Sequence, residues 1–508
     1  MTRPWAALGW VGLVPWLAVL DRAASARAAL AAGLVMSLAF VLAVFGWFAP
    51  AIRTYTGAPS AVALVLLLAS APLLEPQLLT FALARHLARR AAAGFWHATL
   101  ACACAYVGTE WAVPKLFGDT LGHGLYAFEW MRQAADLAGA PGLTFVLIVA
   151  NECVLAALRA LVAGAGLRRG LAPAACVVTL VLGLLGYGAL RCRELAADTD
   201  RGGALTAGIV QADIGQYDRL RARLGTFEAV RTVLDTHFAL STAILERREL
   251  DLLIWPETVY PTTFGTPKSE AGAAFDREIG AFVAGAGVPL VFGAYDREDG
   301  REFNAAVFLE PAGPGPLAFE TYRKASLFPL TERVPVALES NWLRRRLPWL
   351  GTWTAGAGAR VVALVLPDGR TLHVAPLICY DVLDPRLALD AARHGAEVIV
   401  TLSNDSWFSA GPGPRLHLVG AAFLSIETRR PQLRATNTGI SAVIAPTGEV
   451  LDALGVDQRG TLVATVRPEI QATTLMVAWG DWLGPTALGG GFVLLAAAVA
   501  RRPRAPTP

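Results

Sequence analysis

Long runs of apolar residues fill the first part of the chain and return once near its end. Runs long enough to cross a bilayer, about 17–25 residues, lie at residues 26–50, 61–84, 92–113, 141–164, 171–191 and 483–500. A shorter run at residues 5–20 is closed directly by Asp21 and Arg22, which favours a retained span over a cleaved signal peptide. This pattern predicts a polytopic α-helical membrane domain of about six spans at residues 1–192, and a last membrane helix with a short cytoplasmic tail at residues 481–508.

Between these apolar parts, residues 193–480 show the alternating pattern of a soluble α/β domain. Buried strands are predicted at residues 205–211, 252–255, 289–294, 361–365, 373–378 and 397–402. Helices are predicted between them at residues 227–248, 273–285 and 385–396. Such alternation indicates helices layered on sheets, and in these folds reactive side chains collect just beyond strand ends.

Positively charged residues cluster in alternate short loops and so indicate the sidedness of the spans. The clusters are Arg22 with Arg27, Arg85 with Arg89 and Arg90, Arg159 with Arg168 and Arg169, and Arg501, Arg502 and Arg504 in the tail. The other loops carry only Arg53, or Lys115 and Arg132. Because such residues mark the cytoplasmic side, the pattern predicts a multi-pass protein of the cell inner membrane, with residues 193–480 on the periplasmic side.

Composition agrees with a chain that lies partly in lipid. Hydrophobic residues make up 54% and charged residues 17%, against about 25% charged in soluble proteins. The formal net charge of +3 is small and scattered, so no nucleic-acid partner is expected. No Cys/His spacing resembles a zinc site, and neither a metal nor another cofactor is expected. Of the six cysteines, five lie in or at the end of apolar runs, which leaves Cys379 as the one thiol of the soluble part.

Three residues of the soluble part could carry chemistry because each follows a predicted strand: Glu257, Lys324 and Cys379. Taken singly, they could be a surface carboxylate, a surface ammonium and a buried thiol. Together they supply a base, a cation and a nucleophile. A thiol needs a base to become the reactive thiolate, and a tetrahedral oxyanion needs a positive or N–H-bearing partner. The three residues therefore predict acyl chemistry at Cys379, if the fold brings them together.

The segments around these residues resemble the catalytic motifs of a known superfamily. IWPE at residues 254–257, YRK at 322–324 and LICYD at 377–381 look like the three motifs of the nitrilase superfamily. Further segments resemble its membrane-embedded branch, the apolipoprotein N-acyltransferase family: residues 303–306, 403–408 and 434–440 in the soluble part, and 110–111, 133–136 and 142–145 in the membrane part. The resemblance covers the chain from about residue 8 and implies a nitrilase-like αββα sandwich with a Glu-Lys-Cys triad.

The resemblance implies a two-stage acyl transfer at the membrane. Glu257 would act as general base on Cys379, whose thiolate would take an acyl chain from a phospholipid as a thioester. The α-amino group of a diacylglyceryl-cysteine at the N-terminus of an apolipoprotein would then attack this thioester, as the last step of lipoprotein maturation. Lys324 would stabilise the oxyanion in both stages. The resemblance also implies supporting or substrate-binding roles for Asn304, Glu332, Tyr380 and Asp381.

The sequence departs from the family pattern in three places. Leu330-Thr331 stands where the family usually has Phe-Gly before the second glutamate, and Asp381 stands where it typically has Glu. The family's first span has no counterpart, which we expect to reflect a start that lacks one upstream span, since the arginine pattern leaves the N-terminus outside. The first two departures concern substrate detail, because the triad itself is complete.

Two alternatives to acyl transfer remain. The first is a membrane-tethered carbon–nitrogen hydrolase, an amidase that uses the same triad with water as acceptor. A soluble amide needs no lipid-facing helices, whereas a phospholipid donor does, which favours the transferase. The second is a lipoprotein-binding or scaffolding protein without turnover, which a thioester on Cys379 would eliminate.

Residues 341–353 predict a segment that lies at the membrane interface. Three tryptophans and three leucines alternate there with Arg344–Arg346, so that aromatic rings would sit at headgroup level and arginines would meet lipid phosphates. The tryptophans are Trp342, Trp349 and Trp353. Pro348 and Gly351 could let the segment swing as a lid. The alternative is a surface loop whose tryptophans pack on the soluble domain.

The predicted sidedness can be tested with a membrane-impermeant thiol reagent on intact spheroplasts. The reagent should label a Ser269→Cys variant, because this position lies in the predicted periplasmic domain, and should not label a Pro506→Cys variant in the cytoplasmic tail. The unsubstituted protein gives the background. Labelling at Pro506→Cys and not at Ser269→Cys would overturn the topology and, with it, the lipoprotein assignment.

Overall fold

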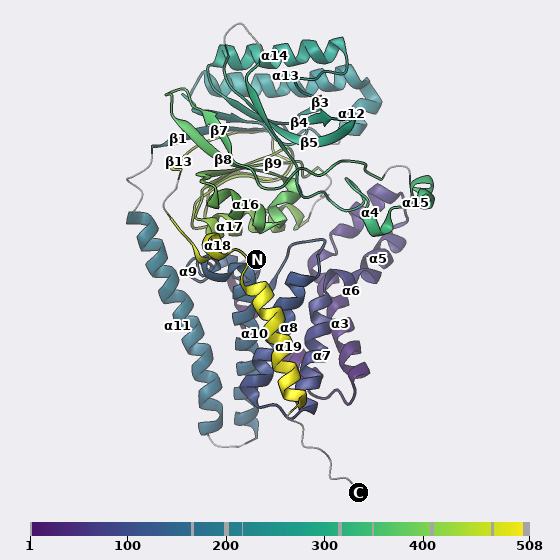
Figure 1. Ribbon diagram of the computed structural model, residues 1–508, viewed down its shortest axis with the longest axis vertical. Helices are drawn as coiled ribbons and strands as arrows, with labels where there is room; N and C mark the ends of the chain where they lie inside the picture. The colour runs from purple at the N-terminus through teal and green to yellow at the C-terminus, as the bar shows by residue number, and fades with distance from the viewer. Residues whose placement is uncertain are drawn as a thin grey trace. The chain divides into compact units, whose positions relative to one another are not determined.

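The computed structural model describes residues 3–163, 167–197, 203–215, 217–312, 317–347, 350–406, 411–468 and 472–500. The chain divides into two compact units, drawn in Figure 1. One unit comprises residues 1–196 with 479–508, and the other comprises residues 197–478.

The first unit is helical throughout its described residues. Its elements are α1 (Arg3–Ala6), η1 (Ala7–Trp10), α2 (Val14–Leu20), α3 (Ala26–Phe45), α4 (Phe48–Thr56), α5 (Ser60–Ala69), α6 (Ala71–Leu74), α7 (Pro76–Arg90), α8 (Phe95–Ala112), η2 (Leu121–Ala127), α9 (Glu129–Arg132), α10 (Ala135–Val162), α11 (Leu167–Ala197) and α19 (Leu483–Ala500). Small residues let these helices approach closely, as expected in a membrane. A Cβ on Gly108 of α8 would lie 2.5 Å from the backbone of Leu488 in α19.

Among the described residues, four helices are long and apolar enough to cross a membrane. They are Ala26–Phe45, Ala135–Val162, Gly170–Ala197 and Leu483–Ala500. The apolar run predicted at residues 61–84 is not one helix, because it is divided between α5, α6 and α7. Its last break falls at Pro76, which has no N–H to donate and whose ring disfavours a helical conformation before it. The first unit therefore has the character of a membrane domain, while the count of about six spans stays a prediction.

The second unit contains two β-sheets that pack face to face. In its described residues one sheet has the order β13-β1-β2-β4-β5-β6, with β3 paired to β4, and the other has the order β12-β11-β10-β9-β8-β7. The first sheet comprises β1 (Leu205–Gln211), β2 (Leu252–Ile254), β3 (Tyr260–Thr263), β4 (Leu290–Glu298), β5 (Arg301–Leu309), β6 (Phe319–Arg323) and β13 (Gly460–Val466). The second comprises β7 (Val362–Val365), β8 (Thr371–Ile378), β9 (Val398–Ser403), β10 (Gln432–Thr436), β11 (Ser441–Ile444) and β12 (Val450–Leu454).

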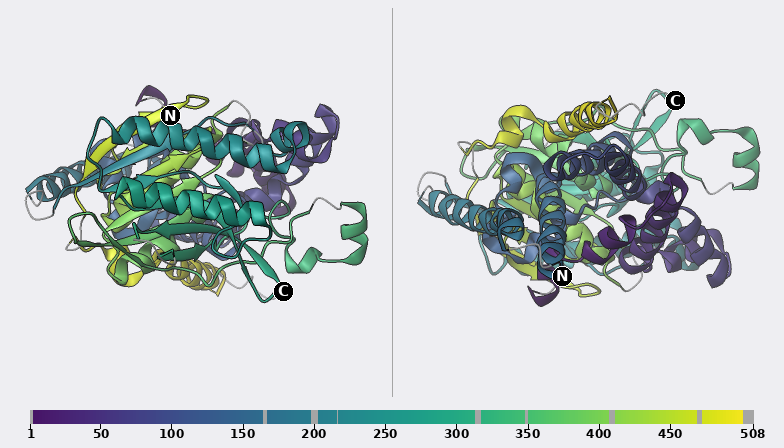
Figure 2. Two further views of the ribbon diagram at one scale, coloured as in Figure 1. Left: turned by 90° about the horizontal axis from the view of Figure 1, so that it is seen from above. Right: turned by 90° about the horizontal axis from the view of Figure 1, so that it is seen from below.

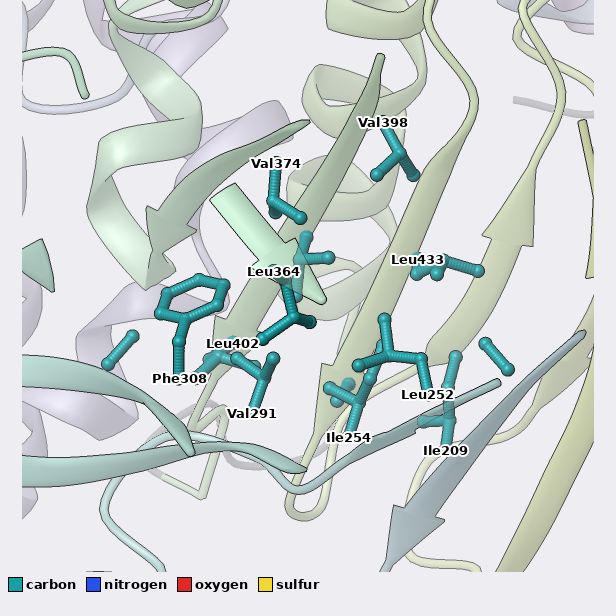
Figure 3. Packing of buried hydrophobic residues seen from close by; sticks show 14 of the residues in the cluster. Ile209, Leu252, Ile254, Val291, Phe308, Leu364, Val374, Val398, Leu402 and Leu433 are labelled. Carbon is teal, nitrogen blue, oxygen red and sulfur yellow. The ribbon is translucent and has the colours of Figure 1, made fainter. Parts of the chain in front are cut away.

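A buried apolar core fills the space between the two sheets. Figure 3 shows Ile209, Ile254 and Val291 of the first sheet facing side chains of the second. These partners include Leu364, Val374, Val398, Leu402 and Leu433. The inward side chains come from both sheets, so the core holds the sheets in a fixed mutual position.

Helices cover the outer faces of the sandwich. On the first sheet lie α13 (Thr226–Leu245) and α14 (Glu270–Ala286), which run side by side in Figure 2. Their apolar faces pack on Trp255 and Phe292 of that sheet. On the second sheet lie α16 (Pro385–Arg393) and α17 (Gly413–Thr428). This order of layers confirms the predicted αββα sandwich. The remaining helices are α12 (Tyr217–Leu224), η3 (Val336–Leu338), α15 (Asn341–Arg346), η4 (Cys379–Leu383) and α18 (Leu475–Trp479).

Strand direction brings several strand ends to one edge of each sheet. Strands β1, β2 and β4 are parallel, and β6 runs the same way because β5 is antiparallel to both of its neighbours. In the second sheet β8, β9 and β10 are parallel. The residues that follow β2 and β6 therefore share one edge, and so do those that follow β8, β9 and β10.

Candidate active site

The three residues predicted to carry the chemistry follow strands of both sheets. Glu257 lies beyond the end of β2, Lys324 directly follows β6, and Cys379 begins η4 directly after β8. All three side chains are buried. The first sheet thus provides the carboxylate and the ammonium, and the second sheet provides the thiol.

A close backbone approach fixes the turn that carries Glu257. Gly293 of β4 lies against this turn, and a Cβ there would be 2.5 Å from Glu257 Cα. Thr258, the next residue, has a φ of +60°, a left-handed conformation that non-glycine residues adopt rarely. A larger residue at position 293 would therefore displace the base.

Lys324 connects the two glutamates of the site. Its Nζ donates to Glu257 Oε1 at 3.2 Å and to Glu332 Oε1 at 2.8 Å. Asn304 Nδ2 donates to the same two oxygens, at 2.7 Å and 3.3 Å. The structure therefore brings Asn304 and Glu332, both named by the resemblance, together with the base and the cation.

Backbone amides hold the second oxygen of each glutamate. The N–H of Asn404 donates to Glu257 Oε2 at 2.8 Å, and the N–H of Phe328 donates to Glu332 Oε2 at 2.7 Å. Both carboxylates are therefore fixed in orientation. The Glu332 side chain is 17% exposed and that of Lys324 only 2%, so Glu332 lies nearer to the opening of the site.

Burial and charge together set the protonation of the three groups. Burial raises the pKa of Glu257, and Lys324 opposes this rise without cancelling it. Burial alone would lower the pKa of Lys324, but Glu257 and Glu332 raise it well above its usual value. Burial, and then the charge of Glu257, raise the pKa of Cys379 against the opposing charge of Lys324. The resting site therefore holds a neutral thiol, an ammonium and a carboxylate of raised proton affinity, which suits proton transfer from Cys379 to Glu257.

Asp381 connects the end of β6 to the turn that carries the thiol. Its Oδ1 accepts from the N–H groups of Ala325 and Ser326, at 3.2 Å and 2.7 Å. Its Oδ2 accepts from Tyr322 Oη and from the N–H of Ile378, both at 3.0 Å. Burial raises the pKa of Asp381 to about 7, against the charge of Lys324 and these hydrogen bonds. Asp381 therefore links the residues next to Lys324 to those next to Cys379 through hydrogen bonds.

Tyr380 and the segment after Glu332 lie beside this cluster. The Tyr380 ring meets the Phe328 ring edge-on, with centroids 5.0 Å apart. Gly351 is held close, because its N–H donates to Leu330 O at 3.1 Å and a Cβ there would lie 2.4 Å from Glu332 O. Gly351 therefore anchors the segment at this point, which does not fit the hinge expected of it.

The predicted interfacial tryptophans differ in their surroundings. Trp342, in α15, is 62% exposed, whereas Trp349 lies outside the described residues. The Trp353 ring packs on the Tyr295 ring, with centroids 4.6 Å apart, and the backbone N–H of Trp353 donates to Glu332 O at 3.0 Å. Trp353 therefore fits the alternative in which the tryptophans pack on the soluble domain. Trp342 is exposed, as expected of a residue at the membrane interface. A groove of about 280 Å³ is lined in part by Val334, Val336, Arg344 and Trp353.

Several buried polar residues near Cys379 were not singled out from the sequence. His417 Nε2 lies 3.1 Å from the carbonyl oxygen of Cys379, and Asp405 and Arg434 surround its other nitrogen. Asp405 and Arg434 fall in segments that carried the family resemblance, but His417 was marked by no motif. Position could have found Asp405, which lies just beyond the end of β9, whereas Arg434 lies within β10. In the described part of the chain, no cluster of His, Cys, Asp and Glu could hold a metal ion.

Two family models match the chain, one to each unit. Residues 206–474 match the carbon–nitrogen hydrolase family. Residues 2–153 match the N-terminal domain of apolipoprotein N-acyltransferase.

Curated relatives match over most of their length. An apolipoprotein N-acyltransferase of Bdellovibrio bacteriovorus is 27% identical over 92% of this chain and 85% of its own. One of Chlorobaculum tepidum is 26% identical over 97% of this chain and 92% of its own. One of Agrobacterium fabrum is 30% identical over 72% of this chain and 66% of its own.

Solved structures are similar to about half of the chain. An amidase from Nesterenkonia sp. is 18% identical and covers 54% of this chain and 94% of its own, with a TM-score of 0.37. A Saccharomyces cerevisiae member of branch 10 of the nitrilase superfamily is 17% identical and covers 53% of this chain and 91% of its own, with a TM-score of 0.39. From the family models and the curated relatives together, the chain belongs to the carbon–nitrogen hydrolase family and, within it, to the apolipoprotein N-acyltransferases.

Proposed function

We propose that this protein moves an acyl chain from a membrane phospholipid to the α-amino group of the diacylglyceryl-cysteine of apolipoproteins, through a thioester on Cys379. The observation that carries the proposal is the buried Glu257–Lys324–Glu332 cluster within electrostatic reach of Cys379, in a chain that also holds helices long enough to span a membrane. The arginine pattern supports an inner-membrane protein whose catalytic unit faces the periplasm.

In the first stage, Glu257 takes the proton from Cys379 Sγ as the sulfur attacks the ester carbonyl of the phospholipid. The carbonyl oxygen becomes an oxyanion, which the ammonium of Lys324 stabilises. Collapse of this intermediate breaks the ester C–O bond, and Glu257 returns the proton to the leaving lysophospholipid oxygen. The products are an acyl thioester on Cys379 and a lysophospholipid.

In the second stage, the neutral α-amino group of the acceptor attacks the thioester carbonyl. Lys324 again stabilises the oxyanion, and the nitrogen loses a proton to a carboxylate of the site. The C–S bond breaks, and the proton passes to the sulfur as the amide forms. Glu332 is the more exposed of the two glutamates that Lys324 binds, so it is the carboxylate better placed to meet an incoming amine.

The amidase alternative differs only in the acceptor, because water would resolve the same thioester. The curated relatives that match along both units are named as N-acyltransferases, which favours the amine. A phospholipid donor also accounts for the membrane unit, which a soluble amide would not require.

The nucleophile is tested by intact mass spectrometry of the purified protein with phospholipid alone. The wild type should gain one acyl chain, which a diacylated lipopeptide then removes. Cys379→Ala should form no adduct and transfer nothing, because loss of a nucleophile typically costs several orders of magnitude in rate. Substantial transfer by a Cys379→Ala protein with an unchanged melting temperature would rule the mechanism out. Discharge of the wild-type adduct by water at the same rate as by lipopeptide would favour the amidase.

The roles of the charged groups are tested by timing the two stages separately. Glu257→Gln removes the base, so adduct formation should collapse. In the wild type, adduct formation should also decline as the pH falls through the raised pKa of Glu257, since the carboxylate exists only above it. Lys324→Met removes the group that stabilises the oxyanion, so the rates of both stages should fall by about 10²–10³-fold or more.

Glu332→Gln provides the contrast, because it should allow the thioester to form but slow its discharge to the amine. Equal and small effects of all three substitutions on both stages would show that these residues do not share one catalytic site.

The role of the interfacial segment is tested by replacing its exposed tryptophan. Trp342→Ser should slow acylation by phospholipid without unfolding the protein, because an exposed aromatic ring contributes lipid contact and little packing. Trp349→Ser is expected to act in the same way. Cleavage of a short, water-soluble ester should be nearly unaffected. Trp353→Ser is the matched control: its ring packs on Tyr295, so it should lower the melting temperature and slow both substrates. Parallel losses on both substrates with Trp342→Ser would show that this segment is structural and not a lid.

A further inference from the structure

A chain of buried polar side chains leads from the loop after β9 to the backbone of Cys379. Ser403 Oγ donates to Asp405 Oδ1 at 2.7 Å, and Arg434 Nη2 donates to Asp405 Oδ2 at 3.3 Å. The same Arg434 nitrogen lies 3.0 Å from His417 Nδ1. His417 Nε2 lies 3.1 Å from the carbonyl oxygen of Cys379. Each of these four residues is buried.

The partners of His417 determine which of its nitrogens carries the proton. A guanidinium can only donate, so Nδ1 accepts from Arg434. A carbonyl oxygen can only accept, so Nε2 donates to Cys379 O. Asp405 Oδ1 lies farther from Nδ1, at 3.4 Å, and its own role is to hold Arg434. These two contacts place the donated proton on Nε2.

The carbonyl that His417 binds belongs to a strained residue. Cys379 has a φ of +48°, a left-handed conformation that residues with a side chain adopt rarely because Cβ crowds the backbone. Such conformations persist only where the surroundings hold them. The peptide group after Cys379 is planar, so a hydrogen bond to its carbonyl fixes the ψ angle of Cys379 and thereby the direction of the Cα–Cβ bond that carries the thiol.

We propose that His417 is a positioning residue that holds the backbone of Cys379 in the conformation that aims its sulfur, with Asp405 and Arg434 keeping His417 in the required tautomer. The proposal rests on the proposed function insofar as Cys379 is the nucleophile. Gly439 provides the space for this arrangement, because a Cβ there would lie 2.7 Å from Asp405 Cβ.

The same loop also holds the base. The N–H of Asn404 donates to Glu257 Oε2 at 2.8 Å, and Asp405 is the next residue. The loop after β9 therefore connects the base directly to the chain of residues that holds the nucleophile. Displacing Asp405 would disturb both, so His417, which bonds directly to the carbonyl oxygen of Cys379, is the sharper position for a test.

The test compares three variants of the full-length protein. His417→Leu keeps the volume and removes the hydrogen bond. His417→Gln keeps a planar group that can donate to Cys379 O and accept from Arg434. His237→Leu is the matched control, since His237 is also buried but lies in α13, against Trp255. The measurements are kcat and KM for acyl transfer from phospholipid to a diacylated lipopeptide, the melting temperature, and the rate at which iodoacetamide alkylates Cys379, located by peptide mapping.

The expected result is a fall in kcat of about 10²-fold for His417→Leu, the size that a displacement of about 1 Å can cause. Its KM and melting temperature should stay close to those of the wild type, and alkylation of Cys379 should slow. His417→Gln should restore most of kcat, and His237→Leu should retain it. A wild-type kcat in His417→Leu would overturn the proposal. Equal losses of kcat in His417→Leu and His417→Gln, in proportion to their losses of melting temperature, would also overturn it.

Failure of the proposed function is a separate result. If the wild type forms no thioester with phospholipid, the transferase mechanism fails. The alkylation rates of the same proteins still decide whether His417 positions Cys379. Slower alkylation in His417→Leu that His417→Gln reverses supports the proposal, and equal rates in all the variants overturn it.

Discussion

The buried ammonium of Lys324 is the interaction on which the arrangement of the site depends. Removing a charge from water costs several kcal/mol even after the protein relaxes. Glu257 and Glu332 offset this cost by binding the same ammonium, and Asn304 bonds to both carboxylates. Lys324 therefore holds three segments together: the end of β2, the end of β6 and the segment around residue 332. Without Lys324, the two carboxylates would face each other with no cation between them.

The thiol comes from the other sheet, so the packing of the two sheets is itself part of the catalytic alignment. The core between them fixes their separation. Hydrogen bonds then join residues of the two sheets at the site: Tyr322 and the N–H groups of Ala325 and Ser326 donate to Asp381, and the N–H of Asn404 donates to Glu257. A shift of one sheet against the other would break these bonds and separate Glu257 from Cys379. Stability of the sandwich and competence for chemistry are coupled for this reason.

The sequence predicted the parts of the molecule whose pattern depends on burial of apolar side chains. The strand at residues 205–211 was located to the residue, and the residues after the predicted strands form the charged cluster. The strand β10 (Gln432–Thr436) was missed because its buried side chains include Gln432, Arg434 and Thr436, which bond to polar groups inside the fold and so carry no hydrophobic alternation. His417 was missed for a related reason, since its partner at Cys379 is a backbone carbonyl, which no side-chain pattern can reveal.

Burial of the thiol would also help the proposed transfer to prevail over hydrolysis. Burial raises the pKa of Cys379 and so favours the neutral thiol, and it raises the pKa of the nearby Glu257, which makes this carboxylate a better acceptor for the proton of the thiol. The charge of Lys324 acts on the oxyanion in a medium of low dielectric constant, where it is worth more than in water. In the proposed mechanism, the same enclosure would limit the access of water to the thioester. The acceptor would then reach the thioester from the side of Glu332, the more exposed of the two glutamates, while the more buried Glu257 would serve the thiol.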